Sequence, residues 1–127
     1  SWVGSPDIIG VANGKLTLAD LKTSAKPYCR WWPKDLEKGS IEWRNRLGGY
    51  MKFNKCCLQL GAYALGIEQT LNMKVQQAAI LVSTPEGTQL FKITRNHLNS
   101  AQDKWLKVVN EYYSDPAREE MYDPSLI

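Results

Sequence analysis

Residues 7 to 22 read Asp7-Ile-Ile-Gly-Val-Ala-Asn-Gly-Lys-Leu-Thr-Leu-Ala-Asp-Leu-Lys22, and this stretch decides the fold. Two apolar runs flank Asn13-Gly14. Asn-Gly between such runs is the strongest short-range hairpin signal, because a type I′ turn needs positive φ at both central residues. The sequence therefore predicts a β-hairpin that ends at Lys22.

The two-residue loop also predicts the register of this hairpin. It pairs Val11 with Leu16 and, farther from the turn, Asp7 with Asp20. Residues directly opposite each other point to the same face, with Cβ atoms about 4.5–5.5 Å apart. Lys22 lies two residues beyond Asp20, so it shares that face. We expect the hairpin to present two carboxylates and an amine together.

This grouping suits a metal site. Like charges directly opposite each other are destabilising unless a cation or a shared proton separates them. Carboxylates such as Asp7 and Asp20 are hard oxygen ligands that suit Mg²⁺ or Mn²⁺. Lys22 beside the metal could stabilise developing negative charge or orient an attacking water. The alternative is an ordinary hairpin with exposed charges near its open end.

The wider sequence carries three motifs in a characteristic order. They are Gly4-Ser-Pro-Asp7, Asp20-Leu-Lys-Thr-Ser-Ala-Lys26 and Gln59-Leu-Gly-Ala-Tyr63. In this order they resemble the PD-(D/E)XK nucleases of the RecB type, and most of all the single-strand DNA exonuclease branch of phages and mitochondria. The resemblance extends over most of the chain, from about residue 3 to residue 113.

The resemblance implies a restriction-endonuclease-like αβββαβ core and a Mg²⁺- or Mn²⁺-dependent deoxyribonuclease. It adds the Leu21 carbonyl as a metal ligand beside the two aspartates. It also implies that Gln59 and Tyr63 brace Lys22 and the scissile phosphate. That family has a helix upstream of the hairpin, often with a glutamate ligand, and we find none here. We therefore expect one nuclease-like domain over residues 1–127 that lacks this helix.

Several of these residues also have a simpler interpretation. Gln59 and Tyr63 are four residues apart on a predicted helix and, taken alone, are typical of a helix surface. The Thr23 and Ser24 hydroxyls could contact a phosphate or a metal-bound water. They could equally end the strand by bonding to local backbone.

Aromatic and basic residues alternate between residues 26 and 50, where proline and glycine also recur. Aromatic faces stack on unpaired bases, and the stacking contributes about 1–3 kcal/mol of binding free energy per base, while neighbouring cations follow the phosphates. We expect Lys26, Arg30, Trp31 and Trp32 to contact single-stranded DNA. The alternative is a tryptophan pair that seals one edge of the core, beside a short solvated helix at residues 33–37.

The rest of the chain predicts an α/β domain with a mixed central sheet and helices on both faces. Both faces of the hairpin are apolar, which favours cover on both sides. The further elements we expect are a helix over 52–69, strands over 75–84 and 89–94, a helix from about 96 to 113, and a loosely ordered tail over 115–127. His97, the only histidine, receives no role.

Composition narrows the class of protein. The chain has 127 residues, 43% of them hydrophobic, and a formal net charge of +3, which is ordinary for a globular domain. Its three cysteines form no Cys-x-x-Cys, which argues against a disulfide framework, a zinc site and a four-cysteine iron–sulfur cluster. Free thiols and the lack of a long apolar run favour an intracellular protein without a membrane span, in a bacterial or phage-infected cytoplasm or in mitochondria.

Three functions follow as hypotheses. The first is a deoxyribonuclease of DNA replication, repair or recombination. The second is a nucleic-acid-binding module that does not cut, which would shift DNA in a gel and leave it intact. The third is a small-molecule phosphodiesterase, against which salt-sensitive binding of long single strands would argue.

Overall fold

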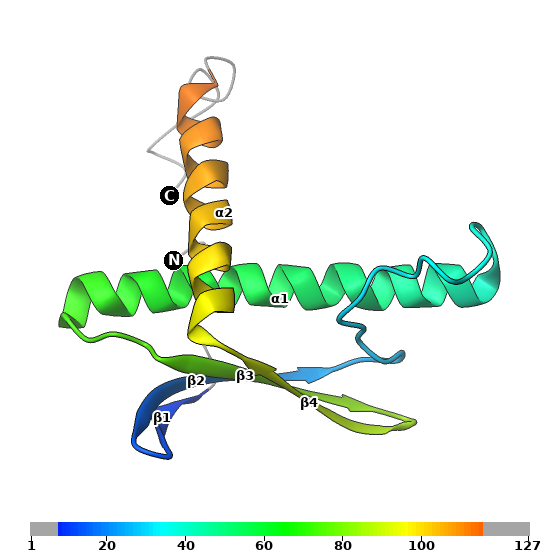
Figure 1. Cartoon of the computed structure of the whole chain (residues 1–127), viewed down its shortest axis with the longest axis horizontal. Coiled ribbons are helices and arrows are strands. Elements are labelled where there is room, and N and C mark those ends of the chain that lie inside the picture. Colours follow the sequence, from blue (N-terminus) through cyan, green and yellow to red (C-terminus); the bar gives the residue numbers. More distant parts are fainter. Residues whose placement is uncertain (1–7, 116–127) are drawn as a thin grey trace, which may run out of the picture.

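The computed structural model describes residues 8–115, which form an α/β fold of one four-stranded mixed sheet and two helices (Figure 1). The predicted fold class is confirmed. The elements in chain order are β1 (Ile8–Ala12), β2 (Lys15–Thr23), α1 (Ile41–Leu71), β3 (Gln77–Thr84), β4 (Gly87–Ile93) and α2 (Arg95–Ser114). Neither helix of this part of the chain has the length and apolar character that a membrane span needs.

The β1–β2 hairpin has the predicted turn and register. Asn13 and Gly14 have φ values of 52° and 74°. Val11 pairs with Leu16, as the two-residue loop requires. Asp7 lies outside the described residues, and so does its predicted pairing with Asp20.

The sheet order is β1-β2-β3-β4. The β2 and β3 strands are parallel, and α1 makes the crossover between them, while β4 returns antiparallel to β3. Pro85 and Glu86 form the turn of this second hairpin. Gly87 follows at φ 135°, a backbone conformation that favours glycine.

The first helix is longer than predicted, because it begins at Ile41 rather than at Lys52. Ser40 caps it, since its side chain accepts a hydrogen bond from the Trp43 amide at 3.1 Å. Gly49 lies within this helix and permits a close contact. A Cβ there would lie 2.5 Å from the Pro27 carbonyl oxygen.

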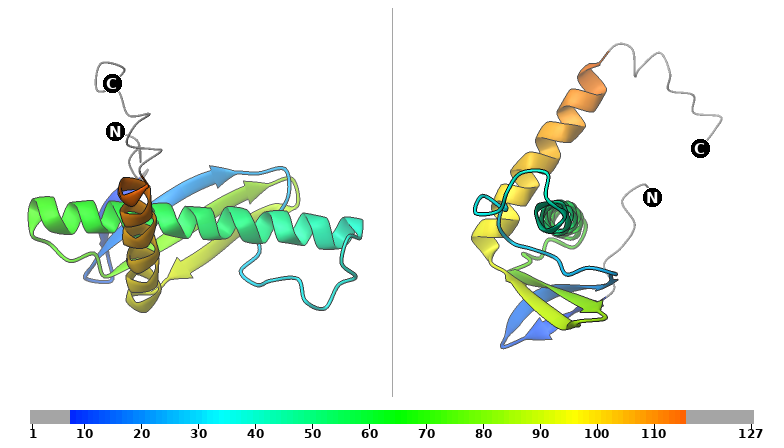
Figure 2. Two further views of the ribbon diagram at one scale, coloured as in Figure 1. Left: turned by 90° about the horizontal axis from the view of Figure 1, so that it is seen from above. Right: turned by 90° about the vertical axis from the view of Figure 1, so that its right-hand side faces the viewer.

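Both helices lie on the same face of the sheet, not on both faces as we expected (Figure 2). The covered face carries the core. Its fully buried members are Leu18, Phe53, Leu60, Ile80, Val82, Ile93 and Leu98 from the strands and helices, and Val75 from the connection between α1 and β3. The other face has Leu21, Leu81 and Leu90 in register across three strands. Within residues 8–115 no element covers these leucines, which are 48%, 38% and 59% exposed.

The second helix crosses α1 and then projects away from the sheet (Figures 1 and 2). Gly61 allows this crossing, because a Cβ there would lie 2.7 Å from the Ala101 Cβ. Only the first turns of α2 are buried, and Val108 and Tyr112 of its predicted apolar stripe are 47% and 40% exposed.

Candidate active site

Asp20 is a buried carboxylate near the end of β2. It is 4% exposed and lies opposite Ile80 of β3. The described pairing of β2 with β1 stops at Ala19, whereas its pairing with β3 continues to Thr23. Asp20 and Lys22 therefore lie on the covered face of the sheet, where β2 extends beyond the described part of β1.

An ion pair joins the two predicted catalytic residues. Lys22 Nζ lies 3.3 Å from Asp20 Oδ2, and the side chains are 34% and 6% exposed respectively. Burial lowers the pKa of Lys22, but the Asp20 charge and hydrogen bond outweigh it, so the net pKa is raised. Lys22 is therefore a cation that is held on a buried carboxylate and still reaches solvent.

Cys56 completes the immediate surroundings of Asp20. Its Sγ donates a hydrogen bond to Asp20 Oδ2 at 3.1 Å. Burial raises the pKa of the Cys56 thiol, and the hydrogen bond and negative charge of Asp20 raise it further. The thiol is thus a protonated donor, not a nucleophile.

Tyr28 is a second residue that sequence reasoning did not include in the site. Its backbone is fastened to β4, since its amide donates to Gln89 Oε1 at 2.8 Å and its carbonyl accepts from Gln89 Nε2 at 3.0 Å. Burial raises the pKa of Tyr28, and Cys56 and Asp20 raise it while Lys22 lowers it. The phenol therefore lies within electrostatic reach of the Asp20–Lys22 pair as a neutral group. No motif or spacing signals this approach, because it depends on how residues 24–40 fold back over the sheet.

The residues next to Lys22 in the sequence differ in where their side chains lie. Thr23 is exposed and lies on the open face, away from Asp20, as does the Leu21 side chain. Ser24 is buried and donates to the Lys26 carbonyl at 2.6 Å, which is the local backbone bond that we considered as its simpler role. Lys52 Nζ donates to Ser24 Oγ at 3.4 Å and so brings another cation toward this end of β2.

Gln59 and Tyr63 lie on the same side of α1 as Cys56. Positions 52, 56, 59 and 63 follow one another at helical spacing, and two of them contact β2 residues or the segment that follows β2. Both Gln59 and Tyr63 are half-buried. Gln59 and Tyr63 thus lie on the side of α1 that faces β2 at Cys56, and their bracing role stays a prediction.

The predicted metal ligands are only partly within the described residues. Asp20 and the Leu21 carbonyl belong to β2, whereas Asp7 lies outside the described part. Within residues 8–115, no three His, Cys, Asp or Glu side chains gather closely enough to hold a metal ion. The oxygen donors that are present suit a hard cation such as Mg²⁺.

Three of the predicted DNA-binding residues do not lie beside Asp20; they are Arg30, Trp31 and Trp32. Trp32 packs edge-on against Trp43 and Tyr50 of α1, with ring centroids 6.4 and 5.7 Å apart. Positions 43 and 50 lie on the opposite side of α1 from Cys56 by helical spacing. Trp32 therefore lies on a side of α1 that does not face Asp20, and Trp31 lines the same hollow as Trp32. Arg30 lies over the rings of Phe53 and Phe91. Lys26 lines a hollow of about 400 Å³ together with Tyr28.

The exposed fractions of Trp31 and Trp32, 73% and 52%, exclude our alternative of a tryptophan pair that seals the core. Residues 33–37 form turns and bends, not the short helix of that alternative.

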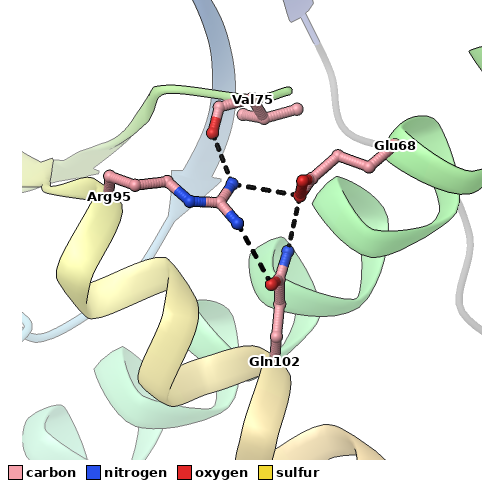
Figure 3. A network of polar contacts seen from close by, with 4 residues as sticks. All are labelled: Glu68, Val75, Arg95 and Gln102. Atoms are coloured by element: carbon pink, nitrogen blue, oxygen red, sulfur yellow. Dashed lines mark hydrogen bonds and ion pairs between the residues drawn. The ribbon is translucent and has the colours of Figure 1, made fainter. Parts of the chain in front are cut away.

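A second acid–base cluster holds the helix crossing together (Figure 3). Arg95 Nη1 donates to Glu68 Oε1 at 3.0 Å and to the Val75 carbonyl at 2.6 Å, and Nη2 donates to Gln102 Oε1 at 3.3 Å. Gln102 Nε2 in turn donates to Glu68 Oε1 at 2.8 Å. The cluster joins the end of α1, the connection that leads into β3, and the start of α2.

Comparisons with known proteins do not assign a family. No family model matches the chain, and no curated protein sequence matches it. Among solved structures, the chain is similar to one entitled "Crystal structure of SSO0001", with a TM-score of 0.37 and 15% sequence identity. That similarity covers 81% of this chain and 39% of the other, so the chain spans well under half of that protein's length.

Proposed function

We propose that this chain is a metal-dependent deoxyribonuclease that hydrolyses DNA phosphodiester bonds at Asp20 and Lys22. The observation that carries the proposal is the ion pair between a carboxylate that is 6% exposed and a lysine that reaches solvent. Perturbed titratable groups gathered in this way are typical of functional sites. The order of the Asp20-Leu-Lys22 and Gln59-to-Tyr63 motifs supports the reaction class.

Each residue of the cluster has a chemical role in this proposal. Lys22, with its raised pKa, stays charged and stabilises the negative charge that develops on the phosphate. Cys56 holds Asp20 Oδ2 in place by donating to it. Tyr28 stays protonated, so its hydroxyl is available as a neutral donor near the pair.

The metal site in this proposal uses the Asp20 carboxylate and the Leu21 carbonyl, with Asp7 as a further ligand. Bound Mg²⁺ or Mn²⁺ supplies Lewis-acid activation of the phosphate and of a water. The proposed setting is DNA replication, repair or recombination inside the cell, in bacterial or phage-infected cytoplasm or in mitochondria. The three free cysteines agree with a reducing compartment.

The test is degradation of end-labelled single- and double-stranded DNA with Mg²⁺, Mn²⁺ or EDTA. We expect metal-dependent cleavage by the unchanged chain, with preference for single strands, and none by Asp20→Asn or Lys22→Ala. Glu68→Gln is the matched control, because it alters the other acid–base cluster. Equal cleavage by all four proteins would indicate a contaminating nuclease and contradict the proposal.

A nucleic-acid-binding module that does not cut is the second candidate. The exposed tryptophans favour it, because Trp31 and Trp32 lie away from Asp20 and need no catalytic site to bind bases. Retention of intact DNA in the presence of metal would support this candidate over the nuclease.

A further inference from the structure

An aromatic and basic surface lies on the α2 side of α1, away from Asp20. Two hollows, of about 560 and 520 Å³, form it, and both are lined by Asn54 and His97. The first hollow also carries Trp31 and Trp32, and the second runs between the two helices. We call the two hollows together the aromatic–basic groove.

Positive charge dominates this groove. Arg30 and Lys34 line its first part. Its second part is lined by Lys55 of α1 and by Lys104 and Lys107 of α2, with Glu111 as the opposing acid. Lys104 and Lys107 are three residues apart, so they share one side of α2.

The cations converge where the two hollows meet. The Arg30 guanidinium lies over the rings of Phe53 and Phe91, 5.2 and 5.6 Å from their centroids, and donates to the Lys92 carbonyl. His97 packs beside Phe53 at 6.1 Å. Burial lowers the pKa of His97, and the charges of Arg30 and Lys104 lower it further. Arg30 and Lys104 come from two separate segments, and the charges of both therefore act on His97, where the two hollows meet.

We propose that the aromatic–basic groove binds a single-stranded nucleic acid, with bases on Trp31 and Trp32 and phosphates along Arg30, Lys104 and Lys107. An acidic protein would satisfy the lysines but would not need two exposed indole rings. A duplex would satisfy the lysines too, but its bases are already stacked. Unpaired bases use both features, because aromatic stacking is independent of sequence and the cations follow the backbone.

This inference deepens the proposed function and rests on it for the choice of nucleic acid as the substrate. Because α1 separates the groove from Asp20, the groove would hold a part of the strand remote from the bond that is cut. Binding in the groove should therefore not need the metal or Asp20.

The experiment measures the affinity of the full chain for a labelled oligothymidine by fluorescence anisotropy in EDTA, at several salt concentrations. The unchanged protein is compared with Lys104→Ala/Lys107→Ala. The matched control is Lys15→Ala/Lys74→Ala, which removes the same charge from exposed lysines of the hairpin and of the α1–β3 connection. Trp31→Ala tests stacking, the EDTA tests independence from the metal, and circular dichroism confirms that each variant is folded.

We expect Lys104→Ala/Lys107→Ala to weaken binding on the order of tenfold near 0.1 M salt. Its salt slope should fall by about 1.4, since each phosphate contact on a single strand contributes about 0.7. Trp31→Ala should weaken binding by roughly fivefold or more. The Lys15/Lys74 control should bind like the unchanged chain.

Equal losses in the groove variant and in the Lys15/Lys74 control would overturn the inference, because they would mean attraction by net charge alone. Tighter binding of a duplex, or competition by an acidic polypeptide as strong as that by the oligothymidine, would also overturn it. Groove-dependent binding without any cleavage would leave the inference standing and refute the nuclease. If the groove variants changed neither DNA cleavage nor DNA binding, the nuclease would stand and the inference about the groove would be overturned.

Discussion

Two acid–base pairs of this molecule have similar geometry and different surroundings. Glu68 and Arg95 are 3.0 Å apart and are bonded further by Gln102 and the Val75 carbonyl, so Glu68 Oε1 and both terminal nitrogens of Arg95 are used within the fold. Asp20 and Lys22 are 3.3 Å apart, and the lysine keeps 34% of its side chain exposed. The difference separates a pair that joins structural elements from a pair that remains available to a ligand.

The largest effect that distinguishes the two pairs should be on cleavage. Asp20→Asn or Lys22→Ala should lower the rate of DNA hydrolysis by about 10²–10³-fold or more, which is typical of losing one group that stabilises transition-state charge. Glu68→Gln should leave the rate of the folded protein unchanged. Rates on end-labelled single strands in Mn²⁺ measure this, and a similar rate loss in Glu68→Gln would erase the distinction.

The next largest effect should be on the free energy of unfolding. Here a change in the Glu68–Arg95 pair should matter more than a change in the Asp20–Lys22 pair. Arg95→Ala should lower the free energy of unfolding by about 2–4 kcal/mol, because it leaves Glu68 without its cation. This expected loss is smaller than that for a fully buried ion pair, because the Arg95 and Glu68 side chains are 23% and 19% exposed. Asp20→Asn should change stability by less than about 1 kcal/mol, because an amide oxygen can still accept from Cys56. Urea unfolding compares the two variants, and a larger loss in Asp20→Asn would contradict the assignment.

The stability of the fold around the Glu68–Arg95 pair also depends on the close crossing of α1 and α2. Gly61→Ala should lower the free energy of unfolding by about 1–3 kcal/mol, because its new Cβ would meet Ala101 at 2.7 Å. Gly66→Ala, one and a half turns farther along α1, has open space around its Cβ and should raise stability by about 0.5–1 kcal/mol. Thermal melts of both variants check this, and equal shifts in one direction would show that the crossing tolerates a methyl group.

Alkaline pH should produce the smallest effect. Burial raises the pKa of the Cys57 thiol from 9.0 to about 12, and burial also raises the pKa values of Cys56 and Tyr28. The folded chain then holds protons that the unfolded chain releases, so stability falls as pH rises above about 9. The slope for Cys57 is at most about 1.4 kcal/mol per pH unit. Unfolding curves at pH 8 and pH 10 should differ less in Cys57→Ala, and an identical pH dependence would contradict the sign argued here.

The parts that the sequence predicted are those governed by local rules. The Asn13-Gly14 turn determines the hairpin register, and that register carries Asp20 and Lys22 to one face. These expectations depend on neighbours in the sequence, so they hold without any knowledge of the tertiary structure.

The parts that could not be predicted depend on contacts between distant segments. Gly49 and Gly61 resemble helix breakers, but each permits another segment to approach α1. Tyr28 joins the candidate site only because Gln89 fastens its backbone, 61 residues away. Trp31 and Trp32 follow Lys22 closely along the chain, yet Trp32 packs against Trp43 and Tyr50, on a side of α1 away from Cys56.

The most direct test of the account is Mn²⁺ binding, followed by electron paramagnetic resonance of the free ion. We predict that the unchanged chain and Glu68→Gln each bind Mn²⁺, and that Asp20→Asn loses this binding. Equal Mn²⁺ binding by all three proteins, or none by the unchanged chain, would contradict the claim that Asp20 belongs to a metal-dependent catalytic site.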